Sequence, residues 1–363
     1  MQNKLSCSIR IIWAIALKDI ADAVRNKMTV SMILGVGFIM LSSMMLPFLL
    51  GLKGTPTAIV YTAEKSTLVR GLTVRDEFRL RPRDSEQEMR DMVGESMTLA
   101  LGLVLPPEFH EAAGSGEVVR VEGIAPHWAD PDEVAELAAF FEQVLSEASW
   151  QTIEIDVAGN VVYPPMDAGG QPFLFAMNFT LMILMIGLSL APYLLIEEKE
   201  THTFDTLMVS PASFGQVVMG KALTGLFYCV TVAVVVVLFN VKVFVHWEVV
   251  GLAVLSGALF AVSGGLLAGA VAKNQATINL WMGLMSLGLL LPIFLSASDS
   301  SRIPAIVRTI APWVPSVAFH KLIVYSMCGN LQHASIWSNV AILVGAASIL
   351  LALVVWQVRR FDE

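Results

Sequence analysis

The sequence predicts an α-helical polytopic membrane protein with six transmembrane helices and an α/β domain inserted between helices one and two. Of its 363 residues, 55% are hydrophobic and only 15% are charged, with a mean hydropathy of +0.68, values typical of membrane proteins. Six apolar runs reach the roughly 20 residues that a helix needs to cross a bilayer. One long polar stretch, residues 51–171, separates the first run from the second.

The six predicted spans are 28–50, 173–196, 217–241, 249–272, 278–297 and 336–358. The alternative is a total of seven spans, with the additional one at 303–327. Pro312 and Pro315 divide that run, and Arg308, His320 and Lys321 would carry charge into lipid. We therefore expect a broken helical pair within 303–330, in the outer leaflet.

The distribution of Lys and Arg predicts the orientation. Ten of them lie before the first span, after the last span and in loops on the same side, whereas the short opposite loops carry four. Because positive charge favours the cytoplasmic side, we expect both termini, including the tail 359–363, and segment 197–221 in the cytoplasm. Residues 51–171 are then extracytoplasmic.

The polar insert has the pattern of an α/β domain. Its strand-like runs are 57–61, 98–105, 117–124 and 152–157, and its helical runs are 85–94, 107–114 and 131–149. The last helix has the clearest start, because Asp130 can cap it, Pro131 suits its first position and Glu133 follows three residues after the cap.

The insert is acidic, with 21 Asp and Glu against 9 Lys and Arg. This excess indicates either attraction of cationic solutes or a periplasmic partner, or simple solvation of an exported domain. Its His110 and His127 have no Cys, His or carboxylate at metal-ligand spacing. Cys7, Cys229 and Cys328 are scattered outside it, so the sequence indicates neither a disulfide framework nor a metal site.

Residues 1–27 predict an amphipathic helix in the cytoplasmic interface. Its apolar stripe consists of Leu5, Ile9, Ile12, Trp13, Ala16 and Ile20. Its polar side consists of Lys4, Arg10, Lys18, Asp22 and Arg25. The helix can serve as a membrane anchor, as a docking element for a partner, or as both.

Segment 197–221 is charged and lies between two membrane-length runs. Glu197, Glu198 and Glu200 stand where the preceding span should end, and negative charge there opposes the helix macrodipole. The acids therefore either begin a second helix or meet basic groups on a partner.

A short amphipathic helix should follow these acids. Phe204, Leu207 and Met208 share one face, while Thr201, Asp205 and Ser210 lie away from it. Pro211 ends that helix, and Ser213 with Gln216 forms a capping box for the next. The pattern favours a docking element over a passive loop.

The run from Gly215 to Lys221 satisfies G-x-x-x-x-G-K, the phosphate-binding pattern. Ala222 stands where Ser or Thr should hold magnesium, and no strand precedes the run. We interpret the match as accidental. The sequence contains no catalytic constellation and no evident ATPase site.

The same segment resembles the intracellular segment of ABC type-2 export permeases, in which E-E-K/R-E precedes T-x-x-x-L-x-x-S-P and a G-K. The matching residues are Glu197, Glu198, Lys199, Glu200, Thr203, Leu207, Ser210, Pro211, Gly220 and Lys221. Residues 100–119 also resemble that family's A-x-G-x-V-x-P-x-x-F segment. The resemblance extends over nearly the whole chain.

The resemblance implies the permease subunit of a bacterial inner-membrane exporter. Such a chain pairs with a second permease chain, identical or paralogous, and with two ABC ATPase subunits, which bind the ATP and Mg; this chain binds no cofactor. Membrane lipid and a periplasmic accessory protein complete the expected partners, without nucleic acid. The implied ATPase-coupling residues are Glu197, Glu198, Lys199, Glu200, Thr203, Phe204, Asp205, Leu207, Met208, Ser210 and Pro211.

Two other function classes stay open: a secondary carrier and a membrane-anchored scaffold or sensor. No predicted span has a charged residue near its centre, which disfavours an ion-coupled carrier. Gly265 and Gly269 form a G-x-x-x-G pair that we assign to close helix contact. No residue pattern selects a substrate.

Overall fold

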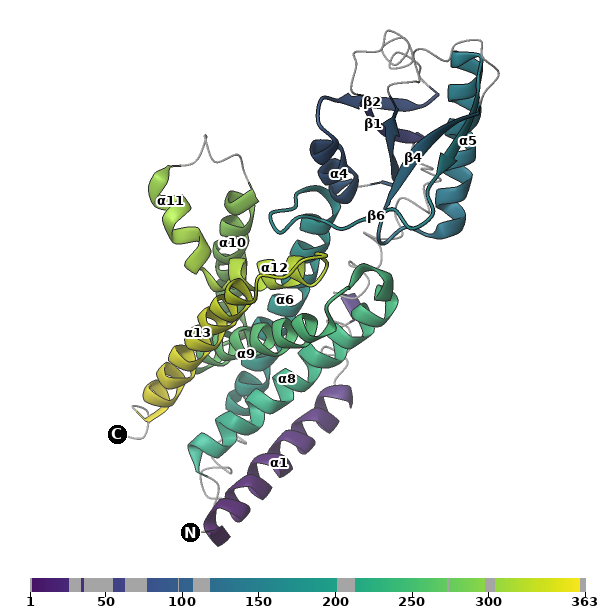
Figure 1. Cartoon of the computed structure of the whole chain (residues 1–363). Coiled ribbons are helices and arrows are strands. Elements are labelled where there is room, and N and C mark those ends of the chain that lie inside the picture. Colours follow the sequence, from purple (N-terminus) through teal and green to yellow (C-terminus); the bar gives the residue numbers. More distant parts are fainter. Residues whose placement is uncertain are drawn as a thin grey trace.

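The structure, a computed structural model, describes residues 2–25, 34–35, 55–62, 77–96, 98–106, 118–200, 213–272, 274–297 and 304–359. It consists of a bundle of long helices with an α/β unit at one end (Figure 1). The start of helix α1 (Gln2–Arg25) and the end of helix α13 (His333–Arg359) lie at the opposite end of the bundle.

Five described helices are long and apolar enough to cross a membrane, over stretches of 21 to 25 residues. They are α6 (Gly170–Glu200), α8 (Phe214–Phe239), α9 (Trp247–Val271), α10 (Gln275–Ala297) and α13. They match five of the six predicted spans. The first predicted span, 28–50, lies outside the described residues except for 34–35, which are helical.

Helix α6 is longer than the sequence predicts. We expected it to end at Ile196, but its backbone continues through Glu197 and Lys199 to Glu200. The acids therefore belong to α6 by their backbone and do not begin a second helix.

The run 303–327 forms two short helices, as predicted, rather than a seventh span. They are α11 (Ala305–Ile310) and α12 (Pro315–Tyr325), separated by a 3₁₀ turn, η3 (Ala311–Trp313). Helix α12 is buried against the bundle, where the Ser316 hydroxyl donates to the Leu289 carbonyl at 2.6 Å and His320 Nε2 donates to the Phe173 carbonyl at 3.2 Å.

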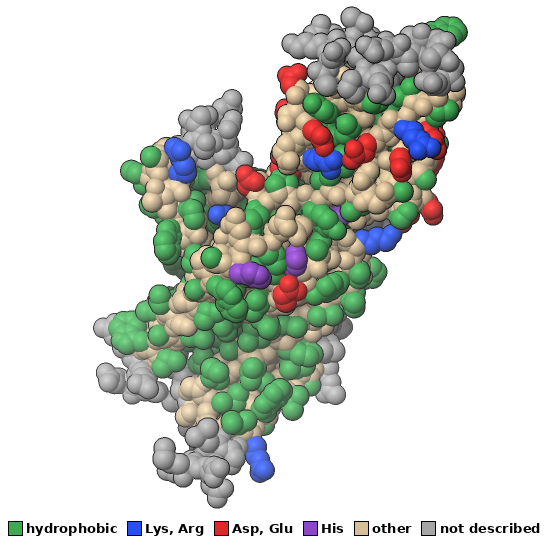
Figure 2. All heavy atoms as spheres, in the orientation of Figure 1, with side chains coloured by type: hydrophobic (Ala, Val, Ile, Leu, Met, Phe, Trp, Pro, Cys, Tyr) green, Lys and Arg blue, Asp and Glu red, His purple; other side chains and the backbone are tan. Residues whose placement is uncertain are grey.

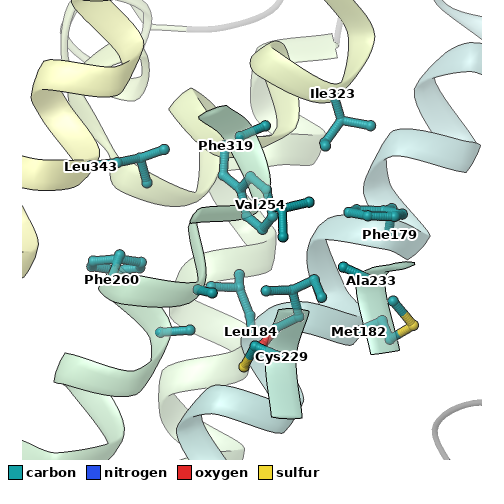
Figure 3. Packing of buried hydrophobic residues seen from close by; sticks show 14 of the residues in the cluster. Phe179, Met182, Leu184, Cys229, Ala233, Val254, Phe260, Phe319, Ile323 and Leu343 are labelled. Carbon is teal, nitrogen blue, oxygen red and sulfur yellow. The ribbon is translucent and has the colours of Figure 1, made fainter. Parts of the chain in front are cut away.

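Helix α9 is the centre of the bundle, with 78% of its span buried. It can lie this close to α6 because small residues face each other: a Cβ on Gly265 would stand 2.4 Å from the Gly187 carbonyl oxygen, and one on Gly269 would stand 2.7 Å from Pro192 Cα. The G-x-x-x-G pair thus makes a close helix contact, as predicted, and the helix that it contacts belongs to the same chain. Around this contact, side chains from α6, α8, α9, α12 and α13 form one core (Figure 3).

The α/β unit is a six-stranded sheet with two helices. Its elements are β1 (Thr57–Thr62), β2 (Arg79–Arg83), α4 (Glu86–Glu95), β3 (Ala100–Leu105), β4 (Val118–Pro126), α5 (Pro131–Ser149), β5 (Thr152–Asp156) and β6 (Val161–Val162). The strand order is β2-β1-β3-β4-β5, with β6 on β4. Among the described strands, β3 and β4 pair antiparallel and the other pairs are parallel.

Alternating side chains give the sheet two buried faces, each covered by one helix. Ala58, Val60 and Leu103 belong to the core shared with α5, while Ile59 and Ile124 belong to the core shared with α4. This alternation is the period of two expected of a β-strand.

Four predicted strands and two predicted helices of the unit match the structure closely. Asp130 caps α5 as expected, with its carboxylate accepting from the Asp132 amide at 3.2 Å. The predicted helix 107–114 lies outside the described residues. Strands β2 and β6 were not predicted, since β2 reads RLRPR and β6 is only two residues long.

The unit is attached to the bundle at η2 (Val241–Val243), the 3₁₀ turn that follows α8. His127 Nε2 donates to the Val243 carbonyl at 3.0 Å, and Lys242 Nζ pairs with Asp130 at 2.6 Å. The hydrogen bond from Lys242 lowers the pKa of Asp130. The C-terminal end of α8 is therefore joined to the start of α5.

The two parts differ in surface chemistry. On the face shown in Figure 2, hydrophobic side chains cover the helical bundle, whereas acidic and basic side chains gather on the α/β unit. A surface of this kind suits a bundle in lipid and a unit in water.

We predict that Gly265→Ala lowers the stability of the bundle, because its methyl group would meet the backbone of α6; overpacking costs about 1–3 kcal/mol. Gly251→Ala on the same helix is the matched control, since nothing lies within 4 Å of its added Cβ and Ala favours a helix by roughly 1 kcal/mol. The thermal midpoints of both variants in detergent check this. Equal midpoints would contradict the close packing.

We predict that the junction between the unit and the bundle weakens as pH falls. Burial lowers the pKa of His127, so the folded protein favours the neutral ring. Its stabilisation is complete above the ordinary His pKa of about 6.5 and is lost below it, as the ring takes up a proton.

The comparison uses His127→Gln, because the Gln amide retains a donor for Val243 but does not titrate. Between pH 7.5 and 5.5, the thermal midpoint of the wild type should fall further than that of the variant. Parallel pH profiles would show that His127 does not control the junction.

Candidate functional site

Helix α1 lies alongside the first half of α8, and both run in the same direction (Figure 1). Three contacts join residues that are 208 apart. The Gln216 amide nitrogen donates to the Ser8 hydroxyl at 2.7 Å, the Thr224 hydroxyl lies 3.3 Å from the Ala16 carbonyl oxygen, and the Tyr228 hydroxyl donates to the Ile20 carbonyl at 2.7 Å. A constant separation means that the two helices pack nearly parallel and in one register.

This placement shows that α1 packs against another helix of the chain; its position in the membrane interface stays a prediction. Helix α8 is long and apolar enough to cross a membrane, and α1 runs along its first half. The side chains of the predicted apolar stripe differ in their exposure to solvent. Ala16 is buried and Ile12 and Ile20 are half-buried, while Ile9 and Trp13 are exposed.

Gly220 allows the two helices to approach. A Cβ at this position would lie 2.6 Å from Ile15 Cγ2 and 2.9 Å from Ile15 Cβ. Any larger residue would therefore push α1 away from α8. The glycine of the predicted G-K pair has a packing role here.

Lys221 is buried against α1. Its Nζ lies 3.3 Å from Asp19 Oδ2, with the two side chains 1% and 5% exposed. Breaking a buried ion pair by removing one partner typically costs about 3–5 kcal/mol. The lysine of the G-K pair therefore connects the N-terminal helix to α8.

The G-x-x-x-x-G-K run does not form a phosphate-binding loop. Gly215, Gly220 and Lys221 all lie inside helix α8, whereas the phosphate-binding pattern requires a loop between a strand and a helix. This agrees with the interpretation of the match as accidental. Among the described residues, no group of three or more His, Cys, Asp or Glu could hold a metal ion.

The start of α8 has the predicted cap. The Ser213 amide donates to Gln216 Oε1 at 2.8 Å, as in a capping box. Gln216 thus contacts both the cap and Ser8 of α1. The first turn of α8 is fixed to the N-terminal helix.

The structure describes some of the predicted coupling residues and not the others. Glu197, Glu198, Lys199 and Glu200 belong to the last turn of α6 by their backbone. The other predicted residues lie outside the described part: Thr203, Phe204, Asp205, Leu207, Met208, Ser210 and Pro211. Their amphipathic helix stays a prediction.

Sequence reasoning missed Asp19. The signal was present, because an acid at this position lies on the same helical face as Ile12, Ala16 and Ile20. A charge inside an apolar stripe indicates a buried partner, and Lys221 supplies it.

A comparison with protein families found one match over nearly the whole chain. The model of the ABC-2 family transporter proteins matches residues 13–363. The chain belongs to this family. It is thus a membrane permease of an ABC transporter. The contacts of Ala16, Asp19 and Ile20 with α8 lie within the matched range, whereas that of Ser8 lies before it. A comparison with curated proteins found no match.

For this ABC-2 chain we predict that Gly220→Ala separates α1 from α8, weakening their packing by about 1–3 kcal/mol. Gly215→Ala is the control, since its added Cβ meets nothing within 4 Å. The measurement is maleimide labelling of Ser8→Cys in a chain whose native cysteines are replaced. Labelling should accelerate with Gly220→Ala only, and an equal rate in both variants would contradict the role of Gly220.

Proposed function

We propose that the chain is the permease subunit of an ATP-driven exporter with six transmembrane helices. Helix α6 ends at the side of the bundle away from the α/β unit, and helix α8 begins at the same side. Residues 201–212 connect them there. We assign this side to the cytoplasm, which places both termini inside and the α/β unit outside.

The observation that carries the proposal is the match to ABC-2 family transporter proteins across 13–363. Permeases of this family work with ATPase subunits. Segment 197–212 is the candidate contact with the ATPase subunit. Its acids precede a predicted helix whose apolar face consists of Phe204, Leu207 and Met208. Docking an amphipathic helix in a groove of a partner is a recurring mode of recognition.

The surface of the bundle supports a second permease chain in the complex. Only 11% of the α10 span is buried, against 78% of the α9 span, and several large apolar side chains of α10 are exposed, among them Leu280, Leu284 and Leu287. Lipid or another permease chain can cover them. We propose two permease chains, identical or paralogous, with two ATPase subunits that bind the ATP and Mg.

Purification of the tagged chain from its native membranes tests this function. An ATP-binding subunit should co-purify, with vanadate-sensitive ATP hydrolysis in the eluate. Phe204→Ala and Leu207→Ala should each reduce the amount of this subunit, since removing a buried anchor at an interface costs about 2 kcal/mol or more, which exceeds a tenfold loss of affinity.

Trp150→Ala and Glu136→Gln are the matched controls. Both residues are exposed on the α/β unit, away from the proposed contact, and both variants should retain the ATP-binding subunit. Absence of any such subunit from the wild-type eluate would contradict the proposed function. Retention by both segment variants would instead place the contact elsewhere.

A further inference from the structure

Tyr163 lies where the α/β unit meets the bundle, directly after strand β6 (Figure 1). Its ring stacks on the ring of His127, with centroids 5.0 Å apart and an interplanar angle of 28°. A Cβ added to Gly329 would stand 2.9 Å from Tyr163 Cδ2, so the same ring lies directly against the backbone of Gly329. Tyr163 therefore contacts the unit and the segment that follows α12 at the same time.

The segment that follows α12 is joined to two further segments. The Ser326 carbonyl accepts hydrogen bonds from the amides of Val245 and His246, at 2.9 and 3.0 Å. The Cys328 thiol donates to the Pro165 carbonyl at 3.5 Å. Ser326 and Cys328 are both buried. This segment thus holds the loop before α9 and the loop before α6 together.

These contacts and those at η2 form a closed circuit. The unit binds η2 through the hydrogen bond from His127 to the Val243 carbonyl. Segment 241–246 binds segment 326–329, which packs on Tyr163, and Tyr163 stacks on His127 of the unit. Because the circuit is closed, the unit can separate from these segments only when at least two of the contacts break.

Helix α4 attaches the unit to the start of α6 as well. The Gly169 amide donates to the Glu95 carboxylate at 3.0 Å. Gly170 has a φ of +56°, and a Cβ there would collide with the Glu95 carbonyl, so only glycine admits this approach. Relative motion is the ordinary expectation for two joined domains. Attachment at α4, at η2 and at Tyr163 opposes such motion here.

We propose that Tyr163 is the positioning residue of a rigid brace, which consists of the α/β unit with 163–170, 241–246 and 326–329. The brace holds the ends of α6, α8, α9 and α12 that lie next to the unit. These ends keep their relative positions while other parts of the bundle move. The rigidity of the brace can be measured in the chain alone, whereas its persistence during transport rests on the proposed function.

Hydrogen–deuterium exchange of the purified chain, read by mass spectrometry, measures this rigidity. Tyr163→Ala removes an aromatic pair, which is worth roughly a twofold to tenfold change in an equilibrium. Exchange should accelerate by that factor at the hydrogen-bonded amides of His127, Val245 and His246 together. Tyr163→Phe retains the ring and should leave all three amides unchanged. Acceleration at His127 alone would mean that the contacts are independent and would overturn the inference.

A disulfide in place of the ring provides a second variant. Tyr163→Cys and Gly329→Cys are combined in a full chain whose native cysteines are replaced. A Cβ at position 329 would lie 3.2 Å from Tyr163 Cβ, near the roughly 3.5–4.5 Å found in disulfides. Oxidation should restore slow exchange at Val245 and His246, and dithiothreitol should reverse it. Equal exchange in the oxidised and reduced forms would contradict the brace.

The wild-type chain purified with its ATPase tests whether the brace persists during transport. Exchange is compared between the nucleotide-free complex and the complex trapped with ATP and vanadate. The amides of His127, Val245 and His246 should exchange at the same rate in both states, while amides elsewhere in the bundle differ. Faster exchange at these three amides in the trapped complex would show that the brace opens.

The two proposals fail differently. If no ATP-binding subunit co-purifies but Tyr163→Ala accelerates exchange at His127, Val245 and His246 together, the proposed function is wrong and the brace stands. If the ATPase co-purifies and trapping accelerates exchange at these amides, the function stands and the brace is wrong.

Discussion

The bundle depends on how closely α9 can approach its neighbours. In lipid, apolar side chains gain little by leaving their surroundings, so helices associate mainly through close packing and hydrogen bonds. Gly265 and Gly269 admit α6, and Gly257 admits the ring of Phe319 from α12, where a Cβ would stand 2.7 Å from the ring. These small residues let α9 lie at the centre, and the other helices take their positions from it.

The contact between α1 and α8 also depends on a glycine, and it includes two charged side chains. Gly220 gives close approach, and the buried Lys221 Nζ lies 3.3 Å from Asp19 Oδ2. At its other end, α8 is joined to the α/β unit through Lys242 and Val243. One helix thus connects the N-terminal helix at one side of the bundle with the α/β unit at the other. A helix fixed at both ends is suited to carry displacement along the bundle.

Much of this fold could be predicted from hydropathy, because lipid imposes length and apolarity on every span. The broken pair at 303–330 followed from Pro312 and Pro315. Strand β2 could not be predicted in this way, since three arginines and Pro82 make it resemble a loop, and it is ordered by pairing with β1 at the sheet edge. The end of α6 was placed too early because a charge run usually marks the end of a span.

The candidate site was predicted only in part, for a different reason. Local signals identified Ser213 and Gln216 as a cap, because capping is a contact between neighbours in sequence. The partners of Lys221, Thr224 and Tyr228 lie about 200 residues away, and no local pattern reveals such contacts. Asp19 was detectable only as a charge inside an apolar stripe.

The central claim is that this permease receives motion at the connection between α6 and α8. The most direct measurement is an electron cryo-microscopy structure of the chain purified from native membranes with a trapped nucleotide. The account predicts an ATP-binding subunit in contact with residues 197–212, with α1 still packed on α8 through Asp19 and Lys221. A complex whose ATP-binding subunit contacts another part of the chain and leaves 197–212 free would contradict it.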